Sequence, residues 1–296
     1  MPTVAENRAA WSKFPWTRQG DEFSRGLGST EMLWWGTLMP RIQRFVPVDT
    51  ILEIAPGFGR CTQYLKGLCR KLIVVDLSTR CIEACRQRFA SSGHITYHVN
   101  DGKSLDAIPD DSVDFAFTYD SLVHAEADVI DAYLVELQRK LRPDGVGFFH
   151  HSNLGAYLRS NGRLPPYLAN DFGNNWRAES VTAEVFAQLC AKAGLECIRQ
   201  ELVVFYPASS LRGGRRITRR LGPLGQWLID RSVRVLNDCF SVFTRHGSRW
   251  SSPPQIFANR QFTREVRNLA RLSRLYELDS LSAGKAGDGR REVVHP

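Results

Sequence analysis

The run Thr50-Ile51-Leu52-Glu53-Ile54-Ala55-Pro56-Gly57-Phe58-Gly59 begins with apolar, β-branched residues and ends in two glycines. Apolar runs of this length are typical of buried strands. Glycines let the backbone turn sharply and let a ligand come close to the main chain. A helix-like stretch follows as far as Cys69. The segment therefore predicts a strand, a glycine turn suited to ligand binding, and a helix.

Strand-like runs alternate with amphipathic stretches from this point to about residue 205. Further strands are expected over 71–76, 95–99, 113–119, 146–150, 197–205 and 239–244, and helices over 79–91, 127–141, 182–193 and 263–278. The turn Arg142-Pro143-Asp144-Gly145 is expected to separate the 127–141 helix from the next strand. Such alternation predicts an α/β fold with a doubly wound, mostly parallel sheet.

The second strand ends in an acid, Asp76, 17 residues after Gly59. A carboxylate at that distance can accept hydrogen bonds from both hydroxyls of a ribose. The dinucleotide fingerprint needs a third glycine, which Arg60, Cys61 and Thr62 do not supply. The pattern therefore favours an adenosine-type ligand without a pyrophosphate.

The arrangement Glu53-x-x-x-Gly57-x-Gly59, with Asp76 ending the next strand, resembles the class I S-adenosylmethionine-dependent methyltransferases. The resemblance implies S-adenosylmethionine as the cofactor and a Rossmann-like sheet of seven strands. It also implies that the last strand is antiparallel, which suits the run 239–244. This chain differs from the usual motif at Ala55-Pro56, which occupies the region of its first glycine.

The resemblance assigns further cofactor residues one by one. Asp101 follows the third strand, where the family places an acid near the adenine amino group, and Tyr119 follows the fourth, where the family lines the methionine end. The family's motif acid approaches the methionine amino group, directly or through water. The expected cofactor residues all lie at carboxyl ends of strands and are Glu53, Gly57, Gly59, Asp76, Leu77, Asp101, Gly102 and Tyr119.

Methyl transfer to a hydroxyl requires an aligned acceptor and removal of its proton. The candidate catalytic residues are Asp120 and His124 after the fourth strand, and His150 and His151 at the end of the fifth. A histidine can accept such a proton at neutral pH. One of His150 and His151 is expected to point into the packing of the sheet, because neighbouring strand residues alternate sides. The spacing of these groups fits no standard metal motif, so no metal is expected.

The overall character of the chain resembles methyltransferases that modify sugars, glycans or natural products. It favours O-methylation of a saccharide or related hydroxylated metabolite, with N- or C-methylation of a small natural product as the alternative. The N-terminal region is rich in aromatic residues, among them Trp34 and Trp35. This Trp pair either stacks on adenine or an acceptor ring, or packs the first helix against the sheet.

The net charge of +8 is concentrated in one segment, since residues 205–249 hold nine arginines opposed by Asp230 and Asp238. Within it, 206–237 is interpreted as a basic insertion that forms a lid or acceptor wall. Its expected partner is an anionic or lipid-linked glycan acceptor or a peripheral membrane surface. An RNA-binding or RNA-modifying enzyme is a second alternative. Nucleic acid is expected less, because Tyr119-Asp-Ser-Leu122 differs from the base-modifying motifs.

The expected organisation is a helical cap over 1–48, the methyltransferase domain over 49–249, a C-terminal helix over 250–280 and a disordered tail over 281–296. The seven cysteines form no disulfide framework, and no secretory signal or 20-residue apolar span is evident. The expected compartment is therefore the cytoplasm. The sequence does not indicate an oligomeric state.

Overall fold

The computed structural model of this chain describes residues 3–165, 168, 176–204, 222, 224 and 235–275. Its strands are β1 (Val48–Ile54), β2 (Cys69–Asp76), β3 (Ile95–Val99), β4 (Val113–Thr118), β5 (Leu141–Ser152), β6 (Leu195–Val203), β7 (Asp238–Arg245) and β8 (Gln255–Asn259). Its helices are α1 (Val4–Lys13), α2 (Thr30–Leu33), α3 (Met39–Ile42), α4 (Thr62–Leu65), α5 (Thr79–Arg88), α6 (Ala127–Lys140), α7 (Ala183–Lys192) and α9 (Phe262–Leu275). Helical segments of 3-10 or π type are η1 (Asp21–Leu27), η2 (Trp34–Leu38), η3 (Leu122–His124) and η4 (Leu154–Tyr157).

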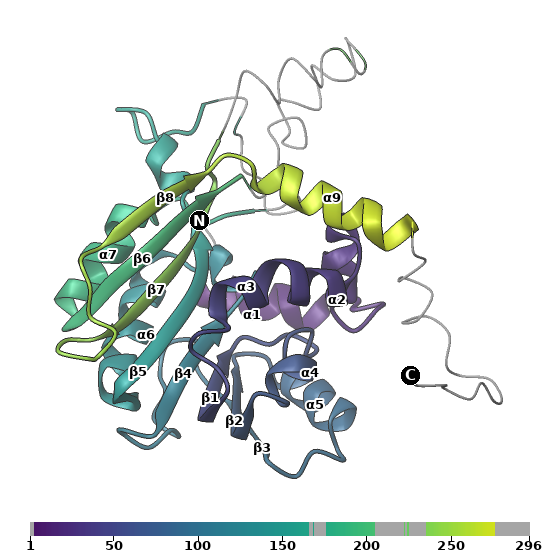
Figure 1. Cartoon of the computed structure of the whole chain (residues 1–296), viewed down its shortest axis with the longest axis vertical. Helices are drawn as coiled ribbons and strands as arrows, with labels where there is room; N and C mark the ends of the chain where they lie inside the picture. Colours follow the sequence, from purple (N-terminus) through teal and green to yellow (C-terminus); the bar gives the residue numbers. More distant parts are fainter. Residues whose placement is uncertain are drawn as a thin grey trace, which may run out of the picture.

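The strands form one sheet in the order β3-β2-β1-β4-β5-β7-β6-β8, with helices on both faces (Figure 1). β7 runs antiparallel between β5 and β6, and the other neighbouring strands are parallel. This confirms the expected doubly wound α/β fold and the antiparallel strand near its end. Because β1, β2 and β4 are parallel, their carboxyl ends meet at one edge, where open sheets of this class bind ligands.

Alternate residues of the central strands fill two hydrophobic cores, one on each face of the sheet. Ile51 of β1 faces the core beneath α2, α4 and α5, whereas Leu52 faces the core beneath α6 and α7. Both faces of a parallel sheet must be covered in this way, which explains why these strands read as nearly continuous apolar runs.

Two strands differ from the sequence-based expectation. β5 begins directly after α6, so Arg142–Gly145 belongs to the strand and is not a separate turn. Glycine at position 145 permits this, because it has no side chain. A Cβ atom there would lie 2.8 Å from the carbonyl oxygen of Val113, which is too close. The eighth strand, β8, was not predicted, because residues 255–258 are exposed and show no inward-facing pattern.

Some expected features lie wholly or mostly outside the described residues. Of the basic insertion 206–237, the structure describes residues 222, 224 and 235–237, and it describes none of the tail 281–296. All seven cysteines are described, and each is a free thiol. No helix in the described part of the chain is long and apolar enough to cross a membrane.

Candidate active site

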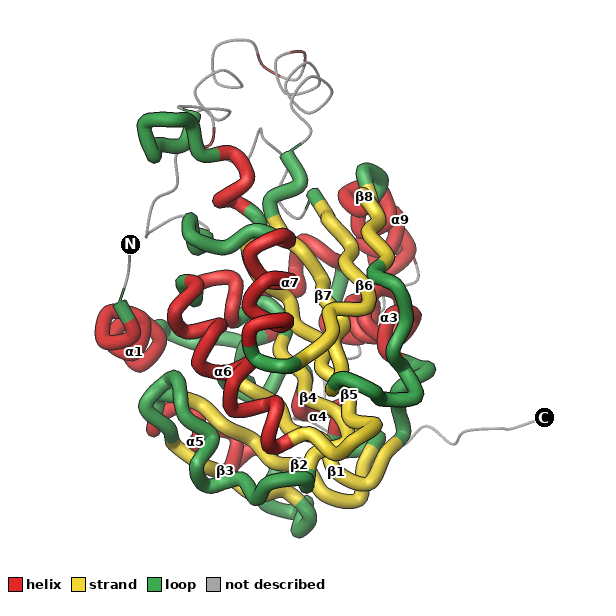
Figure 2. Tube along the Cα trace, turned by 90° about the vertical axis from the view of Figure 1, so that its left-hand side faces the viewer, coloured by secondary structure: helices red, strands yellow, loops and turns green. Residues whose placement is uncertain are grey.

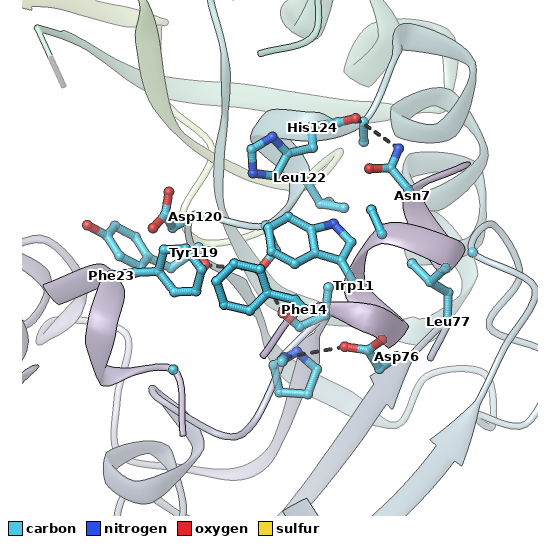
Figure 3. A pocket seen from close by; sticks show the side chains of 18 of the residues that line it. Asn7, Trp11, Phe14, Phe23, Asp76, Leu77, Tyr119, Asp120, Leu122 and His124 are labelled. Carbon is cyan, nitrogen blue, oxygen red and sulfur yellow. Dashed lines mark hydrogen bonds between the residues drawn. The ribbon is translucent and has the colours of Figure 1, made fainter. Parts of the chain in front are cut away.

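A cavity of about 450 Å³ opens at the carboxyl ends of β1, β2 and β4 (Figure 3). Its walls come from the strand ends, from the N-terminal segment and from a short stretch before α7. The lining residues that the site description uses are Asn7, Trp11, Phe14, Trp16, Phe23, Glu53, Gly57, Arg60, Asp76, Leu77, Gly102, Tyr119, Asp120, His124, Trp176 and Arg177. Its volume lies within the range of roughly 300–1,000 Å³ that is typical of small-molecule sites.

The glycine turn follows β1 and is hydrogen-bonded to the last residue of β2. Gly57 and Gly59 have φ angles of +58° and +85°, a conformation that favours glycine. The Gly57 amide donates a hydrogen bond to Oδ2 of Asp76 at 3.3 Å, and the Ser78 amide donates to Oδ1 at 2.8 Å. These bonds fix the Asp76 carboxylate at the end of β2, as Figure 3 shows.

Two buried carboxyl groups lie at this edge of the cavity. Burial raises the pKa of Glu53 to about 8, although Thr62 donates a hydrogen bond to Oε2 of Glu53 at 2.5 Å. Burial likewise raises the pKa of Asp76 to about 7, against the lowering effect of the amide hydrogen bonds. A ligand that brings hydroxyl donors or a positive charge would favour the ionised forms.

These residues fit S-adenosylmethionine. Asp76 presents carboxylate oxygens of the kind that accept the hydrogen bonds of a ribose diol, and Gly57 lines the cavity beside it. The aromatic walls suit a flat base and a sulfonium cation, since cations are attracted to aromatic faces. The fit therefore rests on the donor set and on the shape of the cavity.

The N-terminal segment supplies one aromatic wall of the cavity. Trp11 and Phe14 come from α1 and its end, and Phe23 comes from η1 (Figure 3). Trp16 stacks on Phe58 of the glycine turn, with ring centroids 4.7 Å apart. Trp34 and Trp35 do not line the cavity, because Trp34 is buried against Tyr64 and Trp35 is 56% exposed.

Hydrogen bonds from the sheet domain hold this segment in place. Nη1 of Arg80 donates to the carbonyl oxygens of Ser12 and Phe14 at 2.7 and 2.8 Å. Nδ2 of Asn7 donates to the carbonyl oxygen of His124 at 3.3 Å. The N-terminal segment therefore closes one side of the cavity and is hydrogen-bonded to α5 and to η3. Figure 2 shows α1 beside the domain formed by the sheet and its helices.

His124 is the histidine that lines the cavity. Its ring lies 5.2 Å from the Trp11 ring and 5.5 Å from the Trp176 ring, measured between centroids. Burial, followed by the positive charge of Arg177, lowers the pKa of His124 to about 4. Its Nδ1 atom is buried without a hydrogen-bond partner among the described residues. The imidazole is therefore neutral at pH 7, and Nδ1 is a buried acceptor that no described residue uses.

Asp120 is held by two arginines. Its Oδ2 lies 3.0 Å from Nη2 of Arg60, and its Oδ1 lies 3.7 Å from Nη2 of Arg177. The residue has a φ angle of +56°, which is unusual for a non-glycine residue. Its amide donates to Nδ1 of His150 at 3.1 Å. Its orientation is therefore fixed on both the backbone and the carboxylate sides.

Behind Asp120, a buried ionic cluster extends to β7. Nε2 of His150 lies 3.1 Å from Oδ2 of Asp238, and Nε of Arg177 donates to Oδ1 of Asp238 at 3.0 Å. Burial alone would raise the pKa of Asp238, but the Arg177 charge and the His150 hydrogen bond lower it below its usual value. Because Nδ1 of His150 accepts a hydrogen bond, Nε2 carries the proton that it donates to Asp238.

The structure brings most of the expected site residues to the cavity wall. Glu53, Gly57, Asp76, Leu77, Gly102, Tyr119, Asp120 and His124 line it. Gly59, Asp101, His150 and His151 do not. Asp101 is exposed, and its Oδ1 accepts from the amides of Lys103 and Ser104.

His151 and His150 are both fully buried and point to opposite sides of β5. His151 stacks on Phe186 at 4.2 Å, and its Nε2 lies 2.8 Å from the Ser241 hydroxyl. Burial lowers the pKa of His151 to about 4. Its contacts lie on the α7 side of the sheet, away from the cavity, which gives it a packing role.

Sequence reasoning did not identify Arg60, Trp176 or Arg177 as site residues. Arg60 follows the glycine motif directly, so its position alone was a usable signal. Trp176 and Arg177 lie in a stretch without a recognised motif, and only their contacts with His124, Asp120 and Asp238 reveal their place in the site.

Comparison with known proteins supports the same interpretation. Residues 51–145 match the family model of a methyltransferase domain. A segment of 49 residues is 39% identical to the ribosomal RNA small subunit methyltransferase A of Geobacter metallireducens, and it covers 17% of this chain and 18% of that relative.

Among solved structures, a S-adenosylmethionine-dependent methyltransferase of Leishmania major is similar, with a TM-score of 0.54 and 11% identity over 81% of this chain and 82% of that one. The PH0226 protein of Pyrococcus horikoshii is similar with a TM-score of 0.52 and 18% identity, over 80% of this chain and 98% of that one. At these identities, the likeness shows a shared fold.

Proposed function

We propose that this chain is a class I S-adenosylmethionine-dependent methyltransferase and that it methylates a hydroxyl oxygen of a saccharide or related hydroxylated metabolite. The cofactor supplies an electrophilic methyl group on a sulfonium. The observation that carries the proposal is the neutral His124 ring at the cavity wall, whose Nδ1 has no partner among the described residues.

Asp76 and Glu53 are the residues that would hold the polar parts of the cofactor. The Asp76 carboxylate is fixed by backbone amides and suits the ribose hydroxyls. In the superfamily, the acid at the position of Glu53 approaches the methionine amino group. The aromatic side chains of Trp11, Phe14 and Phe23 would exclude water from the methyl group and limit competing hydrolysis.

His124 would accept the proton of the acceptor hydroxyl. When bound, S-adenosylmethionine would supply the methyl group and leave as S-adenosylhomocysteine, and Nδ1 of His124 would take the proton that the acceptor hydroxyl loses. Asp120 is less suited to this role, because both of its carboxylate oxygens face arginine side chains. A proton acceptor matters for a hydroxyl, which is a weak nucleophile until its proton leaves.

The shape of the cavity supports a saccharide-like acceptor. Aromatic side chains such as Trp11, Phe14 and Phe23 line the cavity, and flat aromatic rings pack well against the C–H face of a sugar ring. The arginine-rich insertion lies largely outside the described residues, so an anionic or lipid-linked form of the acceptor is a proposal from the sequence.

Calorimetry with S-adenosylhomocysteine tests the cofactor site. Asp76→Ala should weaken binding by roughly 2–4 kcal/mol, because it removes the acceptor of two charge-assisted hydrogen bonds. Asp106→Ala, which removes an exposed acid that does not line the cavity, is the matched control and should bind as the wild type does. Unchanged binding by Asp76→Ala, or none by the wild type, contradicts the assignment.

Transfer of a labelled methyl group to a panel of sugars, nucleotide sugars and lipid-linked saccharides tests the acceptor class. Oxygen-linked methyl product is expected. Product found only on amine or carbon acceptors would replace O-methylation with the N- or C-methylation alternative while leaving the cofactor assignment intact.

A further inference from the structure

Helix α9 presents a row of arginines to solvent. Arg264, Arg267, Arg271 and Arg274 are exposed, and their spacing of three, four and three residues places them on one helix face. Leu272 and Leu275 flank this row and are 44% and 71% exposed. We name these six residues the α9 face.

Three arginines of the α9 face, Arg264, Arg271 and Arg274, have no acidic partner among the described residues. Between Gln255 and Leu275 the one acid is Glu265, which lies on the inner side of the helix and pairs with Arg41 at 3.1 Å. In the described part of the chain, no acidic side chain forms an ion pair with Arg264, Arg271 or Arg274. The face therefore presents several positive charges beside exposed leucines.

The inner side of α9 packs closely on the N-terminal region. A methyl group at Gly28 would lie 2.9 Å from Cβ of Ser273, and one at Gly36 would lie 2.6 Å from a Leu269 methyl. Figure 1 shows α9 at the periphery of the molecule, beside α2. The α9 face is thus held by a fixed helix and is not part of the hydrophobic core.

We propose that the α9 face docks on the surface of a membrane that contains anionic lipid. Interfacial helices combine arginines, which pair with lipid phosphates, with leucines that enter the headgroup region. Trp35 precedes Gly36 beside the helix and is itself 56% exposed, and tryptophan favours the membrane interface. RNA-binding surfaces use exposed aromatics to stack bases, whereas Phe262, the aromatic residue of α9, is buried.

Docking through α9 would also orient the candidate active site. Gly28, on which α9 packs, follows directly after η1, and η1 contributes Phe23 to the cavity wall. The cap of the cavity would then lie near the lipid surface, where an amphiphilic acceptor is held. This consequence rests on the proposed function, whereas membrane docking itself does not.

Vesicle co-sedimentation of the full chain, with S-adenosylhomocysteine binding as a check on the fold, tests the proposal. The wild type should bind vesicles of phosphatidylcholine with phosphatidylglycerol and should not bind phosphatidylcholine alone. Arg271→Ser/Arg274→Ser should lower the partition coefficient about 25-fold, because each basic residue at such a surface contributes roughly a factor of five. Leu272→Ser/Leu275→Ser should lower it as well, and this loss should persist at high salt.

The matched control is Arg70→Ser/Lys71→Ser, which removes two exposed charges near the start of β2, outside the α9 face. This control should bind vesicles as the wild type does. Equal loss in the control and the α9 variants would show a nonspecific charge effect and overturn the proposal. Binding that survives every α9 substitution would also overturn it, since the arginines between 205 and 234 remain in those variants.

Two other occupants are distinguished by parallel measurements on the same proteins. A gel shift with RNA that Arg271→Ser/Arg274→Ser abolishes, without vesicle binding, would assign the face to RNA. A dimer that Leu272→Ser/Leu275→Ser converts to a monomer, again without vesicle binding, would assign it to a second copy of the chain. Either result overturns membrane docking and leaves the cofactor site unaffected.

Discussion

At the scale of single residues, the environment of His124 determines its chemistry. The ring lies between Trp11 and Trp176, and burial together with Arg177 lowers its pKa to about 4. A neutral imidazole accepts a proton without first losing one, so this environment would let His124 serve as the proposed base over the whole neutral range. The same burial makes His124 a weaker base than an exposed histidine, so positioning must contribute much of its effect.

His124→Ala should lower the turnover number by roughly 10²–10⁴-fold at saturating cofactor, which is the usual contribution of a general base. Binding of S-adenosylhomocysteine should change little. His151→Phe is the control, because His151 stacks on Phe186 away from the cavity and should affect stability more than rate. A His124 variant within threefold of wild-type turnover would exclude proton removal by histidine.

The pH profile of the same enzyme gives a second test of His124. With a pKa of about 4 the ring stays neutral on lowering the pH from 8 to 6, so the wild-type turnover at saturating cofactor should be flat there. Saturating cofactor is required because the pKa values of Asp76 and Glu53, about 7 and about 8, fall in the same range. An ordinary histidine with a pKa near 6.5 would lose about three-quarters of its neutral form at pH 6. A fourfold fall in turnover between pH 8 and 6 would therefore contradict the buried, neutral state.

At the scale of elements, the glycine turn and the N-terminal cap are fitted to each other. Trp16 stacks on Phe58, and a methyl group at Gly57 would lie 2.6 Å from the Trp16 ring. Gly57 therefore serves two purposes, since it adopts a φ angle of +58° and leaves room for the ring of the cap. The turn after β1 sets the position of α1 over the cavity.

Gly57→Ala should destabilise the protein and weaken cofactor binding, with a backbone cost of about 1–2 kcal/mol from the left-handed conformation. The collision with Trp16 adds to this cost. Trp16→Ala in the Gly57→Ala background should recover the collision part and leave the backbone part. Urea unfolding of both single variants and the double variant measures the coupling, and strictly additive free energies would contradict direct contact between the cap and the turn.

At the scale of the whole molecule, a buried charge cluster links segments that are distant in the sequence. It joins Arg60 after β1, Asp120 after β4, His150 in β5, Arg177 before α7 and Asp238 at the start of β7. Two acids and two arginines balance each other, so each of these buried charges depends on the others for compensation. Asp238 on β7 therefore helps to hold Asp120 at the cavity, because Asp238 pairs with Arg177 and His150 and both of these contact Asp120.

Asp238→Asn should lower the free energy of unfolding by about 3–5 kcal/mol, because it leaves the buried Arg177 without its nearest carboxylate. Arg177→Met should have a cost of similar size. The double variant should lose less than the sum of the two, since it removes both charges together. Urea unfolding measures all three, and full additivity would show that the Arg177–Asp238 pair does not couple the two segments.

The sequence by itself determined the fold class and the cofactor end of the site. The pattern around Glu53, Gly57 and Asp76 is local, because the strand that each residue ends or follows is enough to place it at the cavity. Parallel strands bring their carboxyl ends to one edge, so the order of motifs along the chain was enough to gather them. Hydrophobic periodicity likewise predicted seven of the eight strands.

Only the tertiary structure decided which histidine faces the cavity and what surrounds it. His124, His150 and His151 follow neighbouring strands, but side-chain direction depends on local turns and on the register of β5, which the sequence does not specify. Trp176 and Arg177 join the site across some fifty residues from His124. β8 also escaped prediction, because its pairing with β6 requires only backbone hydrogen bonds and leaves its side chains exposed. Contacts of this kind are long-range, and no local pattern in the sequence records them.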